Sequence, residues 1–260
     1  MYEFLFTQSN TLPMQLLDLS FPTPEENLAC DEALLEMCEQ GYEHEILRFW
    51  EPHSVFVVLG YSDPASTEVN LDACRSAGVP ILRRYSGGGT VVQGPGCLNY
   101  ALVLRTSGAG PLSTIPGSNS YIMNRQRRAL DILLGGGVEL QGHTDLAISS
   151  LKFSGNSQRR KERFLLFHGV FLLNFDLPLI SRYLAHPSRE PSYRKRRPHE
   201  HFLRNLGVSA AAIKLTVRNE WGVEETLGHV PGNRIAELVR TRYSSPDWTD
   251  RTAAQNSVSQ

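Results

Sequence analysis

Two adjacent arginines, Arg83 and Arg84, run almost directly into the glycine triplet Gly87, Gly88 and Gly89. A guanidinium group presents a fixed fork of donors that suits a carboxylate or a phosphate. Consecutive glycines allow positive φ angles and let a ligand come close to bare main-chain N–H groups. Because the residues that follow are rich in β-formers, this stretch predicts a pocket for a small anionic ligand held against a sheet.

The same glycine loop departs from two familiar phosphate-binding patterns. No Gly-Lys-Ser/Thr sequence follows it, which excludes the Walker pattern. It leads into a predicted strand rather than a helix, which excludes the dinucleotide-binding pattern. A glycine triplet alone is more often just a turn, but the arginines before it and the strand after it favour a ligand site.

Two further side chains could take part in chemistry. Lys152 stands among apolar and small residues, so its ammonium could enter a pocket and neutralise a carboxylate or a phosphate. The alternative is a strand lysine that reaches out to solvent, which composition alone slightly favours. His168 lies between two apolar segments, where a hydrogen-bonded structural role is the commoner interpretation and a catalytic role the rarer one.

The elements that must position these residues follow from local patterning. Thr23, Pro24 and Glu26 form a capping-box start for a helix that ends before Gly41. Further helices are predicted over residues 68–77, 118–134 and 233–243. Strands are predicted over residues 46–50, 55–60, 81–84, 90–93, 98–104, 146–151, 151–157 and 164–175. We expect 90–93 and 98–104 to pair as a hairpin, the basic run 159–163 to form a turn, and the chain beyond Pro178 to be irregular up to the last helix.

Composition limits the class of protein. The 260 residues carry 41% hydrophobic and 20% charged side chains and a net charge of −1, which excludes binding of nucleic acid by overall charge. Strands joined by tight turns favour an α+β fold, with a mixed β-sheet flanked by helices, over a doubly wound parallel sheet. We predict one catalytic domain over residues 1–250 and a disordered polar tail over 251–260.

The cysteines and the N-terminal segment suggest a compartment. The four cysteines include no CxxC pair and no zinc-like spacing, which is typical of reduced thiols in a cytosol. We expect no signal peptide, because the first residues lack a basic start and a sustained apolar run. No run approaches the roughly 20 apolar residues of a membrane span. These patterns predict a cytoplasmic protein with no membrane partner.

Several short motifs occur in one order and carry a resemblance. They are Arg83-Arg84-x-Ser86-Gly87-Gly88-Gly89-Thr90-Val91, Lys152-x-Ser154-Gly155-Asn156-Ser157-Gln158, His168-Gly169 and Asp176-Leu177. This series resembles the lipoate–protein ligase, octanoyltransferase and biotin–protein ligase superfamily, and looks most similar to the catalytic domain of lipoate–protein ligase A. The similarity runs from about Leu16 to about Trp248. The two longer motifs are specific together, whereas either alone would not be.

The resemblance implies a class II synthetase-like fold and a two-step reaction. Lipoate, or a related acid such as octanoate, attacks the α-phosphate of ATP, which is supplied with Mg²⁺, and gives an acyl-adenylate and pyrophosphate. A lysine of an acceptor lipoyl domain then attacks this mixed anhydride. The implied partners are lipoyl domains of 2-oxoacid dehydrogenases or the glycine cleavage H protein, with no nucleic acid.

The resemblance also assigns residues. Lys152 matches the catalytic lysine, Arg84 the arginine that meets the nucleotide, and Asp145 an acidic residue near the metal. The residues implied to bind the nucleotide or acyl-adenylate are Arg84, Ser86, Gly87, Gly88, Gly89, Thr90, Val91, Val92, Lys152, Ser154 and Gly155. Strands 55–59 and 98–104 could wall the slot for the apolar acyl tail.

This chain departs from the family pattern in two places. Gln93-Gly94 stands where His-Asp is usual and Cys97 where Asn is usual, which leaves the identity of the acid open. The small C-terminal domain of bacterial ligases is expected to be absent or supplied by another chain, so a separate accessory protein is an implied partner.

Two other functions compete with ligation. An octanoyltransferase uses a cysteine downstream of the lysine as acyl carrier, but no cysteine follows Cys97, which is expected to be a small pocket-lining residue instead. The basic clusters at 158–163 and 194–197 could bind nucleic acid. They are more commonly solvated loops, and they could also receive the acidic surface of a lipoyl domain.

Overall fold

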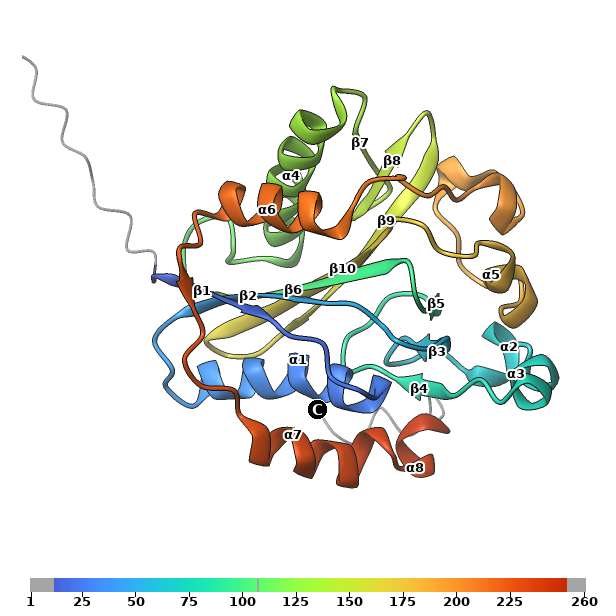
Figure 1. The fold of residues 1–260 in the computed structure, drawn as a ribbon, viewed down its shortest axis with the longest axis horizontal. Coiled ribbons are helices and arrows are strands. Elements are labelled where there is room, and N and C mark those ends of the chain that lie inside the picture. Colours follow the sequence, from blue (N-terminus) through green and yellow to red (C-terminus); the bar gives the residue numbers. More distant parts are fainter. Residues whose placement is uncertain (1–11, 107, 252–260) are drawn as a thin grey trace, which may run out of the picture.

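Two β-sheets organise the chain, for which a computed structural model describes residues 12–106 and 108–251. The larger is a mixed sheet of eight strands in the order β11-β1-β2-β6-β10-β9-β8-β7 (Figure 1). Strand β1 runs parallel to β11 and β2, and the other neighbours are antiparallel. Its strands are β1 (Met14–Asp18), β2 (Glu45–Trp50), β6 (Cys97–Arg105), β7 (Glu139–Gln141), β8 (Asp145–Ile148), β9 (Leu151–Arg160), β10 (Phe164–Leu172) and β11 (Glu225–Thr226).

A second sheet has three strands, β4 (Ile81–Arg83), β3 (Phe56–Leu59) and β5 (Val91–Gln93). Strand β3 lies in the middle, parallel to β4 and antiparallel to β5. Strand β5 is therefore an edge strand, with one row of main-chain donors and acceptors left unpaired by the sheet. Short helices lie near this sheet, namely α2 (Ala65–Glu68), α3 (Leu71–Ala77) and α5 (Pro178–Tyr183).

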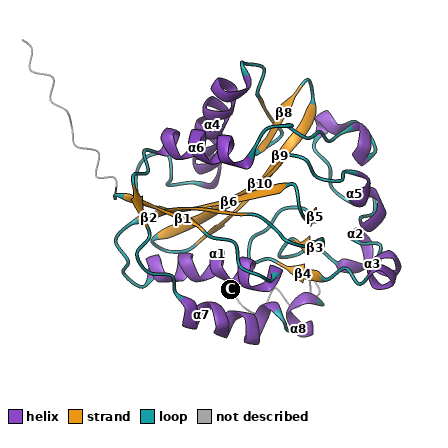
Figure 2. Cartoon of the chain, in the orientation of Figure 1, coloured by secondary structure: helices purple, strands orange, loops and turns teal. Residues whose placement is uncertain are grey.

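Helices cover both faces of the larger sheet (Figure 2). Helices α4 (Ile115–Leu134) and α6 (Ala210–Trp221) pack on one face, and α1 (Pro24–Glu39) and α7 (Gly232–Leu238) on the other. Helix α7 continues as a π-helical turn (Val239–Tyr243), followed by α8 (Pro246–Thr249). Because both faces are covered, β6 is an almost continuous apolar run: Leu98 and Leu102 pack toward α4, while Ala101 and Val103 pack toward α1.

The capping box at the start of α1 is confirmed. The hydroxyl oxygen of Thr23 accepts a hydrogen bond from the backbone N–H of Glu26 at 3.3 Å. The Glu26 carboxylate in turn accepts one from the backbone N–H of Thr23 at 3.1 Å. The α+β class, with a mixed sheet flanked by helices, is confirmed as well.

The expected hairpin between residues 90–93 and 98–104 is wrong. Strand β5 pairs with β3, whereas β6 lies between β2 and β10 in the other sheet. The chain turns between them at Gly96, whose φ is +92° and where a Cβ atom would lie 2.3 Å from the Asn174 carbonyl oxygen. That close approach ties the turn to the end of β10 and leads the chain from the small sheet into the large one.

Two other expectations are changed by the structure. The region beyond Pro178 is not irregular throughout, because it contains α5 and α6. The start of α6 had a local signal: Ser209 caps the helix, and Ile213 and Val217 repeat at helical spacing. Strand β9 continues to Arg160, which shortens the expected turn at 159–163. Apart from Arg251, the tail expected to be disordered lies outside the described residues.

The last helix is confirmed as α7 with its π-helical continuation. Among the helices of residues 12–106 and 108–251, none is both long and apolar enough to cross a membrane.

Candidate active site

A cavity of about 710 Å³ lies where the two sheets, helix α1 and the segment 184–202 meet. Strand β5 of the small sheet and strands β6, β9 and β10 of the large sheet all contribute to its lining. It brings Arg84 and the three glycines of the loop into one cavity with Lys152. The arrangement that the sequence required is therefore present: the two cationic side chains share one cleft.

Arg84 shapes the glycine loop from beneath. Its Nη2 donates to the carbonyl oxygens of Gly87 at 2.5 Å and Gly89 at 2.9 Å, and its Nε to Gly87 at 3.1 Å. Because the C=O and N–H of a trans peptide unit point to opposite sides, the N–H groups of Gly88 and Thr90 point away from Arg84. The loop thus directs carbonyls inward to the guanidinium and presents donors on its other side.

The electrostatics of Arg84 suit an anion near the loop. Burial lowers the pKa of its guanidinium to about 10, so the group still carries its charge at neutral pH. The third nitrogen, Nη1, has no hydrogen-bond partner among the described residues, since the loop contacts use only Nε and Nη2. A positive charge therefore stands behind the outward-facing amides, with one donor nitrogen that forms no hydrogen bond to the described residues.

The loop is fixed by close packing as well. A Cβ atom at Gly60 would lie 1.9 Å from the carbonyl oxygen of Gly88. Gly88 has φ +80°, a conformation that favours glycine. The hydroxyl of Ser157, from β9, donates to the Gly87 carbonyl at 2.8 Å. The loop therefore contacts both the residue that follows β3 in the small sheet and strand β9 of the large sheet.

Lys152 is held at the other wall of the cavity. Its Nζ lies 2.7 Å from Oδ1 of Asp145, and the Tyr193 hydroxyl donates to the second oxygen of that carboxylate at 2.8 Å. Its backbone N–H donates to the Phe202 carbonyl, and its own carbonyl accepts from the Arg204 N–H, both at 2.9 Å. A Cβ atom at Gly155 would lie 2.9 Å from Nζ, so glycine there leaves room for the ammonium.

The structure separates the predicted site residues into two groups. Nine line the cavity: Arg84, Gly87, Gly88, Gly89, Thr90, Val91, Asp145, Lys152 and Gly155. The other three, Ser86, Val92 and Ser154, are buried and do not line it. Ser86 contacts Arg84 and His168, Val92 belongs to an apolar cluster, and Ser154 accepts a hydrogen bond from Asn156.

Several lining residues were not assigned to the site from sequence. Asp63 accepts a hydrogen bond from the Thr90 hydroxyl at 2.9 Å. Oε1 of Gln93 and Nδ2 of Asn99 are buried and have no hydrogen-bond partner within the described part of the chain. Buried polar groups are normally paired, so this unused acceptor and donor suit polar atoms of a ligand. Local patterning gives no signal for Asn99, which lies on a strand between apolar neighbours, whereas Gln93 had been noticed as a departure from the family pattern.

The sequence did contain a signal for another lining residue, Asp31, and for its partner Arg48, which is buried and does not line the cavity. Asp31 is a charged residue on the buried face of α1, and Arg48 is a charged residue in the middle of an apolar strand. They pair with each other, and Asp31 contacts His168, which was noticed in the sequence but interpreted mainly as structural. Charges at positions that patterning predicts to be buried are rare unless they are paired.

Cys97 does not line the cavity, contrary to expectation. Its side chain is 1% exposed and packs in the apolar cluster that contains Val170 and Phe175. It precedes the part of β6 that lines the cavity, and its apolar cluster contains residues of both sheets. Burial raises the pKa of this thiol to about 12.

The basic clusters are not simply solvated loops. Arg160 donates to the Ser118 hydroxyl and to the Leu112 carbonyl. Arg194 is 4% exposed and donates to the Arg197 carbonyl, while both guanidinium groups lie over the Phe202 ring. These arginines stabilise the segments that carry them.

Comparison with known proteins agrees with this geometry. The family described as "Lipoyl protein ligase A/B catalytic domain" matches residues 23–211. Lipoate-protein ligase A subunit 1 of Thermoplasma acidophilum is 30% identical over 169 residues, which cover 63% of this chain and 64% of that protein. Octanoyltransferase LipM of Clostridioides difficile is 25% identical over 255 residues, 86% of each protein. The chain spans less than two thirds of the length of the first three curated relatives, namely 64%, 46% and 58%.

Solved structures show the same fold. The crystal structure of lipoate-protein ligase A bound with ATP superimposes with a TM-score of 0.75 at 26% identity, covering 92% of this chain and 99% of that one. The bipartite lipoate protein ligase of Thermoplasma acidophilum superimposes with a TM-score of 0.79 at 24% identity, covering 92% and 96%. With a family match over most of the described residues and a cavity built from the family's motifs, this chain belongs to the lipoyl protein ligase A/B catalytic domain family.

Proposed function

We propose that this protein is an ATP-dependent lipoate–protein ligase, which forms lipoyl-AMP and transfers the lipoyl group to a lysine of an acceptor lipoyl domain. The observation that carries the proposal is the shared cavity, in which Lys152 and the Arg84-supported glycine loop face one space. Adenylation brings a carboxylate and a triphosphate together. Cationic groups and main-chain donors at fixed positions lower the cost of that approach.

The roles of the cavity groups follow from their positions. The N–H groups of the glycine loop that point away from Arg84 suit phosphate oxygens. The unpaired edge of β5 suits the polar atoms of the nucleotide base. The Lys152 ammonium neutralises the carboxylate of the acid and then the bridging acyl-phosphate. Apolar lining residues, among them Leu28, Trp50, Val58 and Val170, suit an aliphatic chain. Lipoate or octanoate would both satisfy this chemistry.

Magnesium would enter with the triphosphate. Mg²⁺ is commonly held by one or two carboxylates together with substrate phosphates. Asp145 supplies one carboxylate in the cavity, paired here with Lys152. Within residues 12–106 and 108–251 no group of three or more histidine, cysteine, aspartate or glutamate side chains is arranged to hold a metal by itself. The donor set therefore fits an ion bound partly by ATP, whose charge would offset that of the phosphates.

The acceptor would be a lipoyl domain, from a 2-oxoacid dehydrogenase or the glycine cleavage H protein. A solved relative is described as a bipartite lipoate protein ligase with its E2 lipoyl domain. We extend both features to this chain: a lysine of the acceptor attacks the acyl-adenylate, and a separate accessory protein assists activation. No protein nucleophile is needed, because AMP is already a good leaving group.

Intact-mass analysis of an apo lipoyl domain tests the proposal. The domain is incubated with this protein, ATP, Mg²⁺ and lipoate, and in parallel with octanoyl carrier protein in place of the acid and ATP. We expect the mass of one lipoyl group on one lysine in the first mixture, and no change when ATP is left out. Modification of the lipoyl domain only in the second mixture would contradict the proposed ligation and indicate transfer from a preformed donor.

Transfer from a preformed donor is the second candidate, because octanoyltransferases match this chain over most of its length. Such an enzyme needs a reactive thiolate. All four cysteines are buried, and burial raises the pKa of the Cys30 thiol to about 11 and those of Cys38 and Cys97 to about 12. Thiols with such pKa values remain protonated at neutral pH, which disfavours an acyl-thioester.

We therefore expect no octanoyl adduct on Cys97 after incubation with octanoyl carrier protein. The adduct would be sought by intact-mass analysis of the acid-quenched protein, with a Cys97→Ser variant as control. An octanoyl adduct that is present on the wild-type protein and absent from the variant would contradict a mechanism in which no acyl-thioester forms.

Substitution Arg84→Ala should weaken ATP binding. It removes the positive charge beneath the loop and the donors that hold the Gly87 and Gly89 carbonyls. Hydrogen bonds to charged groups contribute about 1.5–3 kcal/mol, so the dissociation constant should rise by roughly 10- to 150-fold. Isothermal titration with ATP measures it, and an unchanged affinity would remove Arg84 from the nucleotide site.

A further inference from the structure

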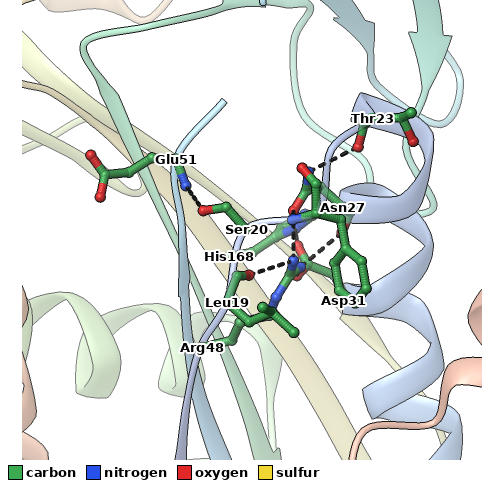
Figure 3. A network of polar contacts seen from close by, with 9 residues as sticks. Leu19, Ser20, Thr23, Asn27, Asp31, Arg48, Glu51 and His168 are labelled. Atoms are coloured by element: carbon green, nitrogen blue, oxygen red, sulfur yellow. Dashed lines mark hydrogen bonds and ion pairs between the residues drawn. The ribbon is translucent and has the colours of Figure 1, made fainter. Parts of the chain in front are cut away.

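A row of buried polar side chains runs from the interior of the large sheet to helix α1. Figure 3 shows Arg48 of β2 among Leu19, Asn27 and Asp31, with His168 beside them. Arg48 is completely buried; its guanidinium pairs with the Asp31 carboxylate and donates to the Asn27 carbonyl at 2.8 Å. Buried charges are tolerated only with such partners, so Asp31 has a fixed position.

The row continues from Asp31 to His168. Burial alone would raise the pKa of Asp31, but the Arg48 charge and the His168 hydrogen bond lower it below its usual value. Asp31 is thus an ionised acceptor, and Nδ1 of His168, 3.1 Å from its Oδ2, must carry a proton. In a neutral imidazole the other nitrogen, Nε2, then accepts a hydrogen bond.

Ser86 connects the histidine to the glycine loop. Its Oγ lies 2.5 Å from Nε2 of His168 and accepts a hydrogen bond from Nε of Arg84 at 3.1 Å. With Nε2 as acceptor, the Ser86 hydroxyl donates to the histidine and accepts from the arginine at once. Arg84 in turn holds the carbonyls of Gly87 and Gly89. One unbroken row therefore joins α1 to the loop amides.

We propose that Asp31 and His168 are positioning residues of this site, which fix the orientation of Ser86 and Arg84 and through them the conformation of the glycine loop. Each hydrogen bond in the row restricts the next group, since an ionised carboxylate sets the histidine tautomer and the tautomer sets the direction of the Ser86 hydroxyl. The consequence for nucleotide binding rests on the proposed function, whereas the consequence for the loop does not.

Ser86, His168 and Asp31 are connected in the same way as the members of a Ser–His–Asp catalytic triad, but the burial of Ser86 argues against a catalytic role. Ser86 is 0% exposed and does not line the cavity, whereas His168 and Asp31 do. The Ser86 Oγ already accepts a hydrogen bond from Arg84. A nucleophile must reach an acyl carbon, so this geometry fits support of the loop.

Helix α1 offers a matched control for Asp31. Glu32, the next residue, is also buried and also bound to an arginine, Arg242, and it accepts from the Tyr243 hydroxyl at 2.7 Å. Its partners belong to the π-helical turn after α7, and Glu32 does not line the cavity. Asp31→Asn and Glu32→Gln each remove one buried carboxylate charge, and only the first should affect the loop.

Amide hydrogen exchange on the intact protein, without substrate, is the first test. In Asp31→Asn and His168→Ala we expect peptides covering residues 84–92 to exchange about tenfold faster than in the wild-type chain, in keeping with loss of a hydrogen bond to a charged group. Glu32→Gln should leave this segment unchanged. Equal exchange in all four proteins, or equal acceleration in Asp31→Asn and Glu32→Gln, would overturn the positioning role.

A rescue series separates positioning from general stability. Glutamine at position 168 can place its amide oxygen near the site of Nε2 and accept from Ser86, whereas alanine cannot. We expect His168→Ala to weaken ATP binding by roughly 10-fold and His168→Gln to recover most of that loss. Equal losses in both variants would contradict the role.

The two failures are distinguishable. If the wild-type protein does not bind ATP but the exchange pattern holds, the proposed function fails while the loop support stands. If ATP binds normally in every variant and the loop exchanges alike, the support fails while the proposed function stands.

Discussion

Substitution Lys152→Ala should abolish acyl-adenylate formation and leave the fold intact. The ammonium is the only lysine group lining the cavity among the described residues, and it faces the space in which carboxylate and phosphate would meet in the proposed reaction. Removing one preorganised group that stabilises developing charge costs about 100- to 1,000-fold in rate. Pyrophosphate release in the presence of lipoate and ATP measures the step directly.

Lys214→Ala is a matched control for this substitution. Lys214 also forms ion pairs with carboxylates, at 2.9 Å from Asp18 and 2.8 Å from Glu51, and its side chain is 21% exposed compared with 26% for Lys152. It lies outside the cavity lining. We expect normal pyrophosphate release from Lys214→Ala and near-native thermal stability from both variants. An active Lys152→Ala protein would exclude the lysine from the chemistry.

Among the substitutions proposed for this protein, Arg48→Met should cause the largest decrease in the free energy of unfolding. Methionine fills much of the same volume but leaves the buried Asp31 carboxylate without its main partner. Breaking a buried pair in this way costs about 3–5 kcal/mol, because the remaining charge stays buried without its ionic partner. Urea unfolding followed by tryptophan fluorescence measures the free energy of unfolding.

The exposed pair Arg75–Asp72 provides the comparison. Its side chains are 77% and 91% exposed, and the two groups are 2.9 Å apart. Exposed pairs contribute about 0–1 kcal/mol, so Arg75→Met should change the free energy of unfolding by less than 1 kcal/mol. Equal effects of the two substitutions would mean that burial of the Arg48–Asp31 pair does not control its contribution.

Much of the local structure followed from sequence because short-range effects control it. The start of α1 was predicted at Thr23 since its capping box needs only neighbouring residues. The strand around Arg48 and the helix ending before Gly135 were predicted by apolar patterning and by a glycine that stops the helix. The missed helix α6 also had local signals, in Ser209 and the spacing of Ile213 and Val217, which the prolines nearby obscured.

The sequence also determined which chemistry the chain can support. Arg84, the glycines after it and Lys152 are the types of residue that anion binding requires, and their motifs predicted the family that the comparison then showed. These motifs could not determine which of the groups contact the ligand directly and which hold the glycine loop in place. The sequence assigned both Ser86 and Arg84 to ligand binding. In the structure Ser86 does not line the cavity, and Arg84 donates hydrogen bonds to the Ser86 hydroxyl and to carbonyl oxygens of the loop.

Only the tertiary structure decided the partners of the buried charges. Asp31 and Arg48 are each a charge in an apolar segment, but pairing between a helix and a strand depends on packing, which no local pattern encodes. The assignment of β5 and β6 to different sheets was likewise a long-range result, since the choice depends on which strands are already in place. That choice opens the cavity, because the segment expected to close a hairpin instead spans the two sheets that form its walls.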